Sequence, residues 1–179
     1  MRKLIVSILV SLDGVYGDPQ SWASDYFDDQ AAEESLAVLL DSDAMLMGRR
    51  TYEYFAPAWS APAGPYLERV NEIRKYVFSS TLTAAAWNNS TVVSGDPAAA
   101  VGQLKRQGAG HLVVYGYGLL AQTLLEHGLV DELNLAIHPV MLGSGTTLFR
   151  PGKRTNLRLV SVTQRGNGVV TLSYTRFMI

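Results

Sequence analysis

Apolar runs and amphipathic segments alternate along the first two-thirds of the chain. Residues 4–10 are almost continuously apolar, which is typical of a buried strand. Residues 25–40 repeat apolar side chains at the helical spacing of about 3.6, which predicts an amphipathic helix. The face of this helix that we expect to be buried carries Ala32, Leu36, Leu39 and Leu40. The same patterns predict strands at residues 44–47, 76–78, 91–93 and 112–115 and helices at residues 51–55, 65–71, 97–107 and 119–126.

The last third of the chain shows strand patterns only. Residues 133–137, 157–163 and 169–177 are expected strands, and residues 164–168 form the turn between the last two. Alternating strands and helices favour a parallel sheet with helices on both faces, whereas consecutive strands favour an antiparallel edge. We therefore expect one α/β domain over residues 1–179, built in three layers with a mostly parallel central sheet and an antiparallel C-terminal hairpin.

Proline and glycine positions predict where the elements end. Pro57 is expected to end the helix at residues 51–55, which leaves residues 56–65 as a proline-rich loop. Asp96 and Pro97 form a helix start, and Gly128 is expected to end the helix at residues 119–126 in a left-handed conformation.

Composition excludes several classes of function. The 15 basic and 16 acidic residues leave a net charge of −1, so the chain has no broad basic field for nucleic acid or an anionic membrane. The absence of cysteine excludes disulfides, thiolate nucleophiles and zinc-thiolate sites, and the three histidines are too far apart in the sequence to indicate a metal site. The first apolar run resembles a strand more than a signal peptide, and no run approaches the roughly 20 residues of a membrane span. We expect a cytoplasmic protein without metal.

Glycines follow three of the expected strands. They occur in residues 11–14, 48–52 and 116–118, where a strand should give way to a turn or a helix. Helix N-termini present unpaired backbone N–H groups and a positive dipole end, which suit phosphate. Two such sites in one small domain suggest a ligand with a pyrophosphate. The alternative interpretation is that these glycines form ordinary tight turns, and that Arg49 and Arg50 are solvated charges.

With these segments placed, nearly the whole chain resembles the dihydrofolate reductase-like superfamily. Within it, the chain is most similar to the reductase domain at the C-terminus of the bifunctional riboflavin-biosynthesis deaminase/reductase, as a small stand-alone member. The matching segments are residues 11–14, 47–53, 77–80, 116–120, 129–133 and 139–143. Their order and spacing together make the resemblance fairly specific.

The resemblance implies an NADPH site. It places the pyrophosphate between the backbone N–H groups of residues 49–51 and those of residues 118–120. Arg49 or Arg50, helped by Ser79 and Ser80, would meet the adenosine 2′-phosphate, since a guanidinium gives charge-assisted, bidentate hydrogen bonds. The full set of implied cofactor-binding residues is Leu9, Gly48, Arg49, Arg50, Thr51, Phe78, Ser79, Ser80, Tyr115, Gly116, Tyr117, Gly118, Leu119 and Leu120.

The nicotinamide is implied to lie against the end of the first strand and the loop after it. Asp13 and Tyr16 are therefore the catalytic candidates, as proton donors, with the acidic residues 25–29 as further candidates. Two positions depart from the riboflavin-pathway reductase. Tyr115 stands where an acidic residue commonly precedes the glycine turn, and Tyr117 stands where a small residue is usual.

These observations predict an NADPH-dependent reductase that transfers a hydride to a small planar heterocyclic or carbonyl/imine substrate. One alternative is a riboflavin-pathway reductase that acts on a ribosylated pyrimidine. Another is a module that binds NADPH without catalysis. A homodimer is also expected, because relatives pair and because the C-terminal strand, residues 174–179, carries apolar side chains that one small sheet does not cover.

Overall fold

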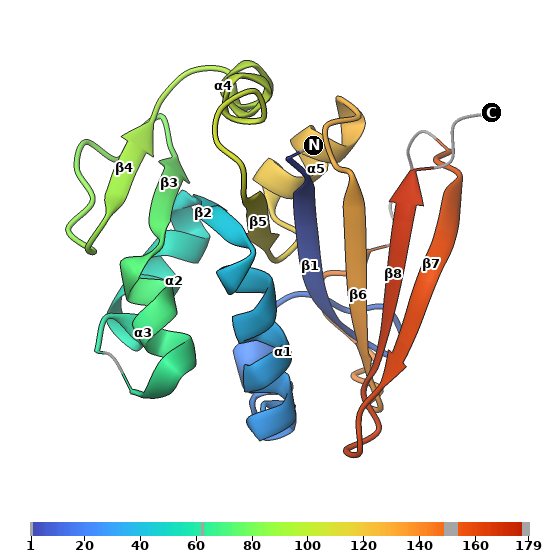
Figure 1. Ribbon diagram of the computed structural model, residues 1–179. Helices are drawn as coiled ribbons and strands as arrows, with labels where there is room; N and C mark the ends of the chain where they lie inside the picture. Colours follow the sequence, from blue (N-terminus) through green and yellow to red (C-terminus); the bar gives the residue numbers. More distant parts are fainter. Residues whose placement is uncertain (1, 62, 149–153, 177–179) are drawn as a thin grey trace.

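The computed structural model describes residues 2–61, 63–148 and 154–176, and these form an eight-stranded sheet with helices on both sides (Figure 1). In space the strands follow the order β4-β3-β2-β5-β1-β6-β8-β7. Neighbouring strands from β4 to β6 are parallel, and β8 is antiparallel to both of its neighbours. The predicted fold class is therefore confirmed. The strands are β1 (Leu4–Ser11), β2 (Ser42–Gly48), β3 (Arg74–Phe78), β4 (Ser90–Val93), β5 (His111–Tyr115), β6 (Glu132–His138), β7 (Leu157–Gln164) and β8 (Val170–Arg176).

The helices cover the two faces of the sheet in separate groups. One face, the α4–α5 face, lies under α4 (Pro97–Leu104) and α5 (Leu119–Glu126). The other, the α1–α3 face, lies under α1 (Asp29–Leu40), α2 (Arg49–Trp59) and α3 (Gly64–Glu72). Two short 3-10 helices, η1 (Pro19–Ser21) and η2 (Ser24–Tyr26), precede α1.

Side chains of β1 point alternately to the two faces of the sheet, so this strand contributes to the packing of both groups of helices. The even-numbered side chains Leu4, Val6 and Ile8 are buried in the apolar core of the α4–α5 face. The odd-numbered side chains of β1 point to the α1–α3 face, because successive strand residues alternate. Full burial of each large aliphatic side chain contributes about 1.5–3 kcal/mol, so these two cores account for most of the attraction between sheet and helices.

The first long helix begins later than the sequence pattern predicts. α1 starts at Asp29 because Asp28 is its N-cap and accepts a hydrogen bond from the backbone N of Ala31 at 2.9 Å. Residues 24–26 form the separate η2. The expected buried face is partly wrong as well. Leu40 is 63% exposed, and the buried residues of α1 are Ala31 and Leu39, since the helix packs against α3 as well as β2.

α2 extends past the proline that was expected to end it. Pro57 lies inside the helix, which continues to Trp59. The rings of Phe55 and Trp59 stack with centroids 3.9 Å apart, and Trp59 also meets Tyr66 of α3 edge-on. Because this aromatic packing needs the last helical turn, it outweighs the hydrogen bond that proline removes. The expected loop at residues 56–65 is therefore wrong at both ends, since α3 already begins at residue 64.

Other predicted ends agree with the structure. Asp96 is the N-cap of α4, and its side chain accepts from the backbone N of Ala98. Gly128 has a φ of 68°, as expected for the left-handed residue after a helix. The last predicted strand corresponds to β8, while its final residue, Phe177, lies outside the described residues.

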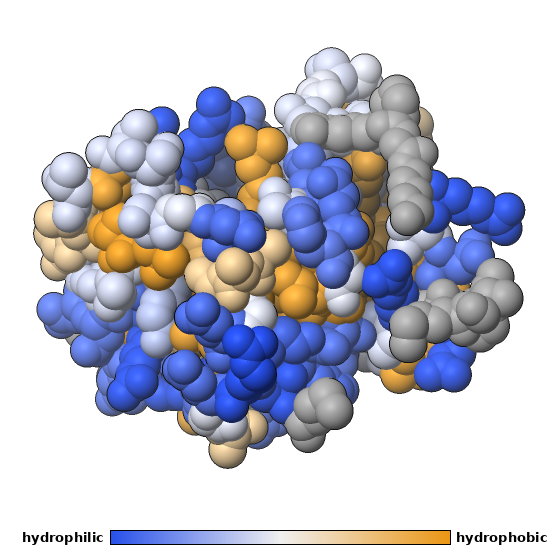
Figure 2. Space-filling model, turned by 90° about the horizontal axis from the view of Figure 1, so that it is seen from above, coloured by the Kyte–Doolittle hydropathy of each residue, from blue (hydrophilic) through white to orange (hydrophobic). Residues whose placement is uncertain are grey.

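The described helices are short. α1 has 12 residues, and no helix among residues 2–61, 63–148 and 154–176 is long and apolar enough to cross a bilayer. In the same ranges, no group of three or more histidine or acidic side chains could hold a metal ion. On the face shown in Figure 2, apolar residues lie in patches between polar ones.

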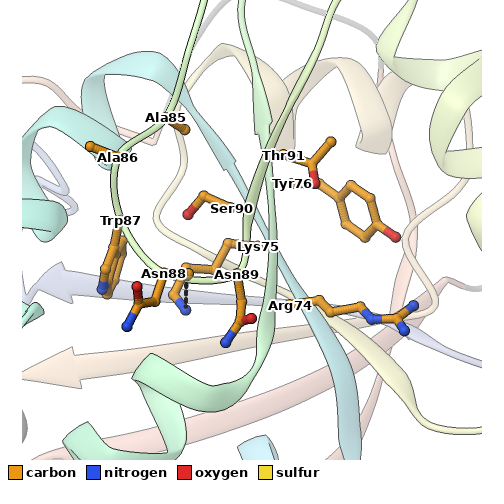
Figure 3. Close-up of a pocket in the computed structure, with 10 residues that line it drawn as sticks. All are labelled: Arg74, Lys75, Tyr76, Ala85, Ala86, Trp87, Asn88, Asn89, Ser90 and Thr91. Carbon is orange, nitrogen blue, oxygen red and sulfur yellow. Dashed lines mark hydrogen bonds between the residues drawn. The ribbon is translucent and has the colours of Figure 1, made fainter.

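Lys75 on β3 is a charged residue that is fully buried. Its Nζ donates to the carbonyl oxygens of Ile73 (2.9 Å), Asn71 (3.1 Å) and Asn88 (3.1 Å), and it lies 4.6 Å from the centroid of the Trp87 ring. Figure 3 shows this side chain beside a hollow of about 530 Å³, bounded by β3 and the loop that leads into β4. Lys75 thus holds that loop against the sheet.

Candidate active site at the strand ends

The carboxyl ends of three adjacent parallel strands bring the glycine segments together. β5 lies between β1 and β2 in the sheet, so residues at the ends of these strands share one edge. Gly116 continues from β5, and its backbone N donates to the carbonyl of Ser7 on β1 at 2.8 Å. Gly48 ends β2 and begins α2. Open α/β sheets commonly bind ligands in this position.

Two helices begin at this edge, each with a glycine as its N-cap. Gly48 precedes α2 with φ −79° and ψ 165°, and Gly118 precedes α5 with φ −70° and ψ −176°. Neither helix has a side-chain hydrogen bond at its cap. The first backbone N–H groups of both helices are therefore without the side-chain partner that usually satisfies one of them.

Each of the three glycines at this edge borders open space. A Cβ atom built on Gly48, Gly116 or Gly118 meets no other atom within 4 Å. Gly116 has a φ of 90°, so its backbone conformation favours glycine. The backbone at Gly48 and Gly118 would accept any residue, so what glycine provides there is the absence of a side chain. We call these three residues the glycine cradle.

The basic and hydroxyl residues next to the cradle differ in whether they already form ion pairs or hydrogen bonds within the protein. Arg49 pairs with Glu53 at 3.0 Å, but both side chains are nearly half exposed, so the pair is weak. Arg50 is exposed. Ser79 accepts hydrogen bonds from the backbone N of Thr81 and Leu82 and so shapes the turn after β3. Ser80 is exposed in the same turn.

The remaining residues expected at the cofactor site divide between surface and core. Leu119 is 80% exposed beside the cradle. Phe78 and Leu120 are buried in the core of the α4–α5 face, so they can offer only backbone groups. Thr51 lies in the first turn of α2, and Leu9 is 40% exposed near the end of β1.

Tyr117 joins two loops of the site. Its ring meets that of Tyr16 edge-on, with centroids 5.4 Å apart, and its carbonyl accepts from Nε2 of Gln122 at 2.9 Å. The bulky side chain therefore packs on the loop after β1, while the neighbouring cradle stays open.

Asp13 fixes the same loop to a second one. Its carboxylate accepts from the hydroxyl of Ser11 (2.6 Å), from the backbone N of Gly143 (2.7 Å) and from that of Leu142 (3.1 Å). These hydrogen bonds, that of Ser11 foremost, lower the pKa of Asp13 to about 2. A carboxylate held in this way is ionised at neutral pH and has no proton to donate. The hydrogen bonds therefore fix the loop after β1 to residues 142–143.

Two acidic residues near the start of α1 are likewise engaged. Asp28 caps the helix and accepts from Nδ2 of Asn167 at 2.7 Å, while Glu34 pairs with Arg165 at 2.7 Å. Asn167 and Arg165 belong to the turn between β7 and β8, so these contacts hold the C-terminal hairpin on α1. Asp28 and Glu34 thus have structural roles.

His138 ends β6 inside an aromatic enclosure. It is 2% exposed, and the rings of Trp22 and Tyr26 meet it edge-on at 5.3 Å each. Nδ1 lies 2.9 Å from the carbonyl oxygen of Ala136. Burial lowers the pKa of His138, so the imidazole is neutral at neutral pH. His138 therefore packs as a neutral ring in this enclosure.

Sequence reasoning missed a set of polar residues on the α1–α3 face. Ser7 interrupts the apolar run of β1, and this was the available signal. Its neighbours in the sheet are Tyr115 of β5 and Asn134 of β6. Oδ1 of Asn134 is buried without a hydrogen-bond partner among the described residues, and the hydroxyl of Tyr115 is buried next to that of Tyr66. Burial, together with the neighbouring hydroxyl of Tyr66, raises the pKa of Tyr115, so it stays protonated.

Comparison with known proteins agrees with this geometry. YyaP of Bacillus subtilis, which is uncharacterized, is 30% identical over 97% of this chain and 94% of its own length. Among solved structures, a candidate riboflavin biosynthesis protein from Shewanella sp. PV-4 aligns with a TM-score of 0.78 at 22% identity, over 98% of this chain and 99% of its own. The deaminase/5-amino-6-(5-phosphoribosylamino)uracil reductase of Thermotoga maritima aligns with a TM-score of 0.68 at 14% identity, over 98% of this chain and 57% of its own.

These structural neighbours share the dihydrofolate reductase-like fold expected from the sequence. The family profile of the RibD C-terminal domain matches residues 2–171, which is nearly the whole chain. The chain therefore belongs to the RibD C-terminal domain family.

Proposed function

We propose that this protein is an NADPH-dependent reductase that acts on a small planar heterocyclic or carbonyl/imine substrate. The observation that carries the proposal is the glycine cradle between two helix N-termini that lack side-chain caps. This arrangement fits a pyrophosphate, because backbone N–H groups and two positive dipole ends point at open space. The membership of a reductase-like family supports the same conclusion.

When bound, NADPH supplies the hydride, and the chain has to hold it, orient it and manage a proton. The backbone of residues 49–51 and 118–120 would hold the pyrophosphate. Leu9 would lie under the nicotinamide, and Asp13 would keep the adjoining loops in place through its backbone hydrogen bonds. Tyr16 is the remaining candidate for donating or relaying a proton, and its hydroxyl lies 3.5 Å from Nε2 of Gln122.

The first test compares NADPH with NADH by fluorescence titration. We expect NADPH to bind about ten- to a hundred-fold more tightly, because Arg49, Arg50 and Ser80 are available to the 2′-phosphate and a charge-assisted hydrogen bond contributes about 1.5–3 kcal/mol. The double variant Arg49→Gln/Arg50→Gln should lose this preference.

Arg74→Gln is the matched control. Arg74 is also an exposed arginine, but it lies at the amino end of β3, whereas Ser79 and Ser80 follow the carboxyl end of this strand. It should keep the preference for NADPH. Equal affinities of the unmodified protein for the two cofactors would remove the 2′-phosphate assignment.

We also propose a homodimer that forms through the outer hairpin. On the edge strand β7, Leu157, Leu159, Val160 and Val162 are between 37% and 59% exposed. Leu159 lies opposite Tyr174 of β8, and Val162 lies opposite Leu172. These side chains share one face of the hairpin, so its apolar surface continues to the edge of the sheet. An apolar strip of this kind on an edge strand is a candidate for contact with a second copy. Met178 and Ile179, which also motivated this expectation, lie outside the described residues.

Light scattering at micromolar concentration checks this proposal. The protein should have twice the 19.5 kDa mass of one chain, and Leu159→Lys/Val162→Lys should reduce the mass to that of one chain. Thr163→Lys, on the opposite side of the same strand, is the control and should leave the dimer intact. A monomer in the unmodified protein would rule the proposal out.

A further inference from the structure

We propose that Gln122 of α5 is a positioning residue that sets the direction of the backbone N–H groups at Gly118 and connects them to the loop that carries Tyr16. The inference rests on the proposed function and deepens it. It names a residue on which cofactor binding depends, and this residue acts through the backbone of the glycine cradle.

Gln122 binds the two peptide carbonyls that flank Gly118. β5 leads through residues 116–118 into α5 (Figure 1). The side-chain Nε2 of Gln122 donates to the carbonyl oxygen of Tyr117 at 2.9 Å, and its backbone N donates to that of Gly118 at 3.1 Å. Because a carbonyl oxygen only accepts hydrogen bonds, the nitrogen end of the carboxamide has to face Tyr117. One residue therefore fixes two successive peptide planes at the start of α5.

These two hydrogen bonds determine where the N–H groups of the same peptides point. No cis peptide bond occurs among the described residues, and in a trans peptide the C=O and N–H bonds point in opposite directions. Since the carbonyls of Tyr117 and Gly118 face Gln122, the N–H groups of Gly118 and Leu119 point away from it. They point out of the N-terminus of α5, where we propose that the pyrophosphate binds.

A turn with two glycines needs such support. Glycine lacks a Cβ atom, so the peptides beside it change orientation at little cost. Gly116 and Gly118 stand on either side of Tyr117, and α5 has no side-chain hydrogen bond at its cap. Donors that already point at the position of an anion bind it more tightly than donors that must first be ordered, because ordering costs entropy. Gln122 supplies the order that the two glycines do not.

The side chain of Gln122 also reaches the loop after β1. Its Nε2 lies 3.5 Å from the hydroxyl of Tyr16, and the rings of Tyr16 and Tyr117 meet edge-on with centroids 5.4 Å apart. Tyr16 thus lies against the same residues that fix the peptide before Gly118. A ligand that immobilises this peptide should therefore also restrain the loop that carries Tyr16, the candidate for donating a proton.

The first test measures the NADPH affinity of Gln122→Met by fluorescence titration. Methionine has a similar length but no N–H group, so the carbonyl of Tyr117 loses its side-chain donor. We expect NADPH to bind about five- to ten-fold more weakly, which corresponds to the loss of one hydrogen bond. Gln103→Met is the matched control, because Gln103 is an exposed glutamine near the end of α4, which leads to the amino end of β5. It should bind NADPH normally.

A ³¹P NMR spectrum of bound NADP⁺ separates a positioning role from a general loss of structure. Each protein is saturated with NADP⁺, so weaker affinity does not affect the comparison. The two pyrophosphate resonances should differ between the unmodified protein and Gln122→Met, because the N–H groups that face them change direction. The 2′-phosphate resonance should be the same in both, because its proposed partners Arg49 and Arg50 belong to α2. A general loss of packing would shift all three resonances.

Amide hydrogen exchange tests the connection to Tyr16. NADP⁺ should slow exchange in residues 12–17 of the unmodified protein and of Gln103→Met, but not in Gln122→Met saturated with the same cofactor. If Gln122→Met binds NADPH with unchanged affinity and gives unchanged pyrophosphate resonances, Gln122 does not position the cradle. An equal effect of NADP⁺ on exchange in all three proteins would contradict the connection to Tyr16. If NADPH does not bind the unmodified protein, the proposed function fails, and this inference fails with it.

Discussion

Replacing Gly118 by valine is expected to reduce the affinity for NADPH by at least about a hundred-fold, a loss of roughly 2.7 kcal/mol, while the protein still folds. The backbone of Gly118 has ordinary dihedral angles, φ −70° and ψ −176°, and a Cβ atom there meets nothing within 4 Å. The variant therefore introduces no strain and no clash within the described protein. Its branched side chain instead occupies the space in front of the α5 N-terminus, where the pyrophosphate would lie.

The measurement combines a circular-dichroism spectrum with a fluorescence titration of NADPH. Gly166→Val is the matched control, because Gly166 also has open space around it and no positive φ, but it lies in the turn between β7 and β8. It should leave NADPH affinity unchanged. If Gly118→Val folds and binds NADPH with unchanged affinity, the N-terminus of α5 does not hold the pyrophosphate, and the proposed cofactor site loses its main support.

Replacing Lys75 by methionine is expected to lower the free energy of unfolding by about 3 kcal/mol. Methionine fills a similar volume but leaves the buried carbonyl of Ile73 without its donor, and a buried unpaired acceptor costs about 1–3 kcal/mol. The part-buried carbonyl of Asn88 also loses the Lys75 hydrogen bond, while that of Asn71 keeps only the hydrogen bond from Nδ2 of Asn89. For a chain of this length, the midpoint of thermal unfolding should fall by about 6–12 °C. Lys3→Met, at an exposed ion pair with Glu132, should change it far less.

The pH dependence gives a second check on Lys75. Burial lowers its pKa from the ordinary 10.5 to about 8. Between these values the unfolded chain binds more protons than the folded one, so the contribution of this group to stability rises with pH. The difference in stability between the unmodified protein and Lys75→Met should therefore widen from pH 8 to pH 10. A constant difference over that range would mean that Lys75 titrates normally in the folded state.

Several features of the site were predictable from the chain because they depend on neighbouring residues. Glycine after a strand and before an amphipathic segment gave Gly48 and Gly118 as helix starts, and both are N-caps in the structure. The prediction was less accurate where packing overrides local preference. α2 passes through Pro57 because Phe55 and Trp59 stack, and no local rule contains that contact.

The chemical role of Asp13 also depends on contacts that are distant in the sequence. In the sequence it is an acidic residue beside the expected nicotinamide, which makes it a reasonable proton donor. Its hydrogen-bond partners Leu142 and Gly143 follow about 130 residues later, and they help to lower its pKa to about 2. The chemistry of this carboxylate is thus set by a loop that the sequence around Asp13 does not reveal.

By itself, the sequence determined the order and type of most strands and helices, the two glycine-capped helix starts at Gly48 and Gly118, and the fold class. Local periodicity and turn chemistry are properties of short segments, so they can be recognised from each segment alone. The tertiary structure alone decided which residues share a face. The structure brings together Ser7, Tyr115 and Asn134, more than 100 residues apart from first to last, because β5 and β6 both pair with β1 in a sheet whose order differs from the order of the chain. Register between distant strands depends on how the whole sheet packs, so no local pattern could have specified it.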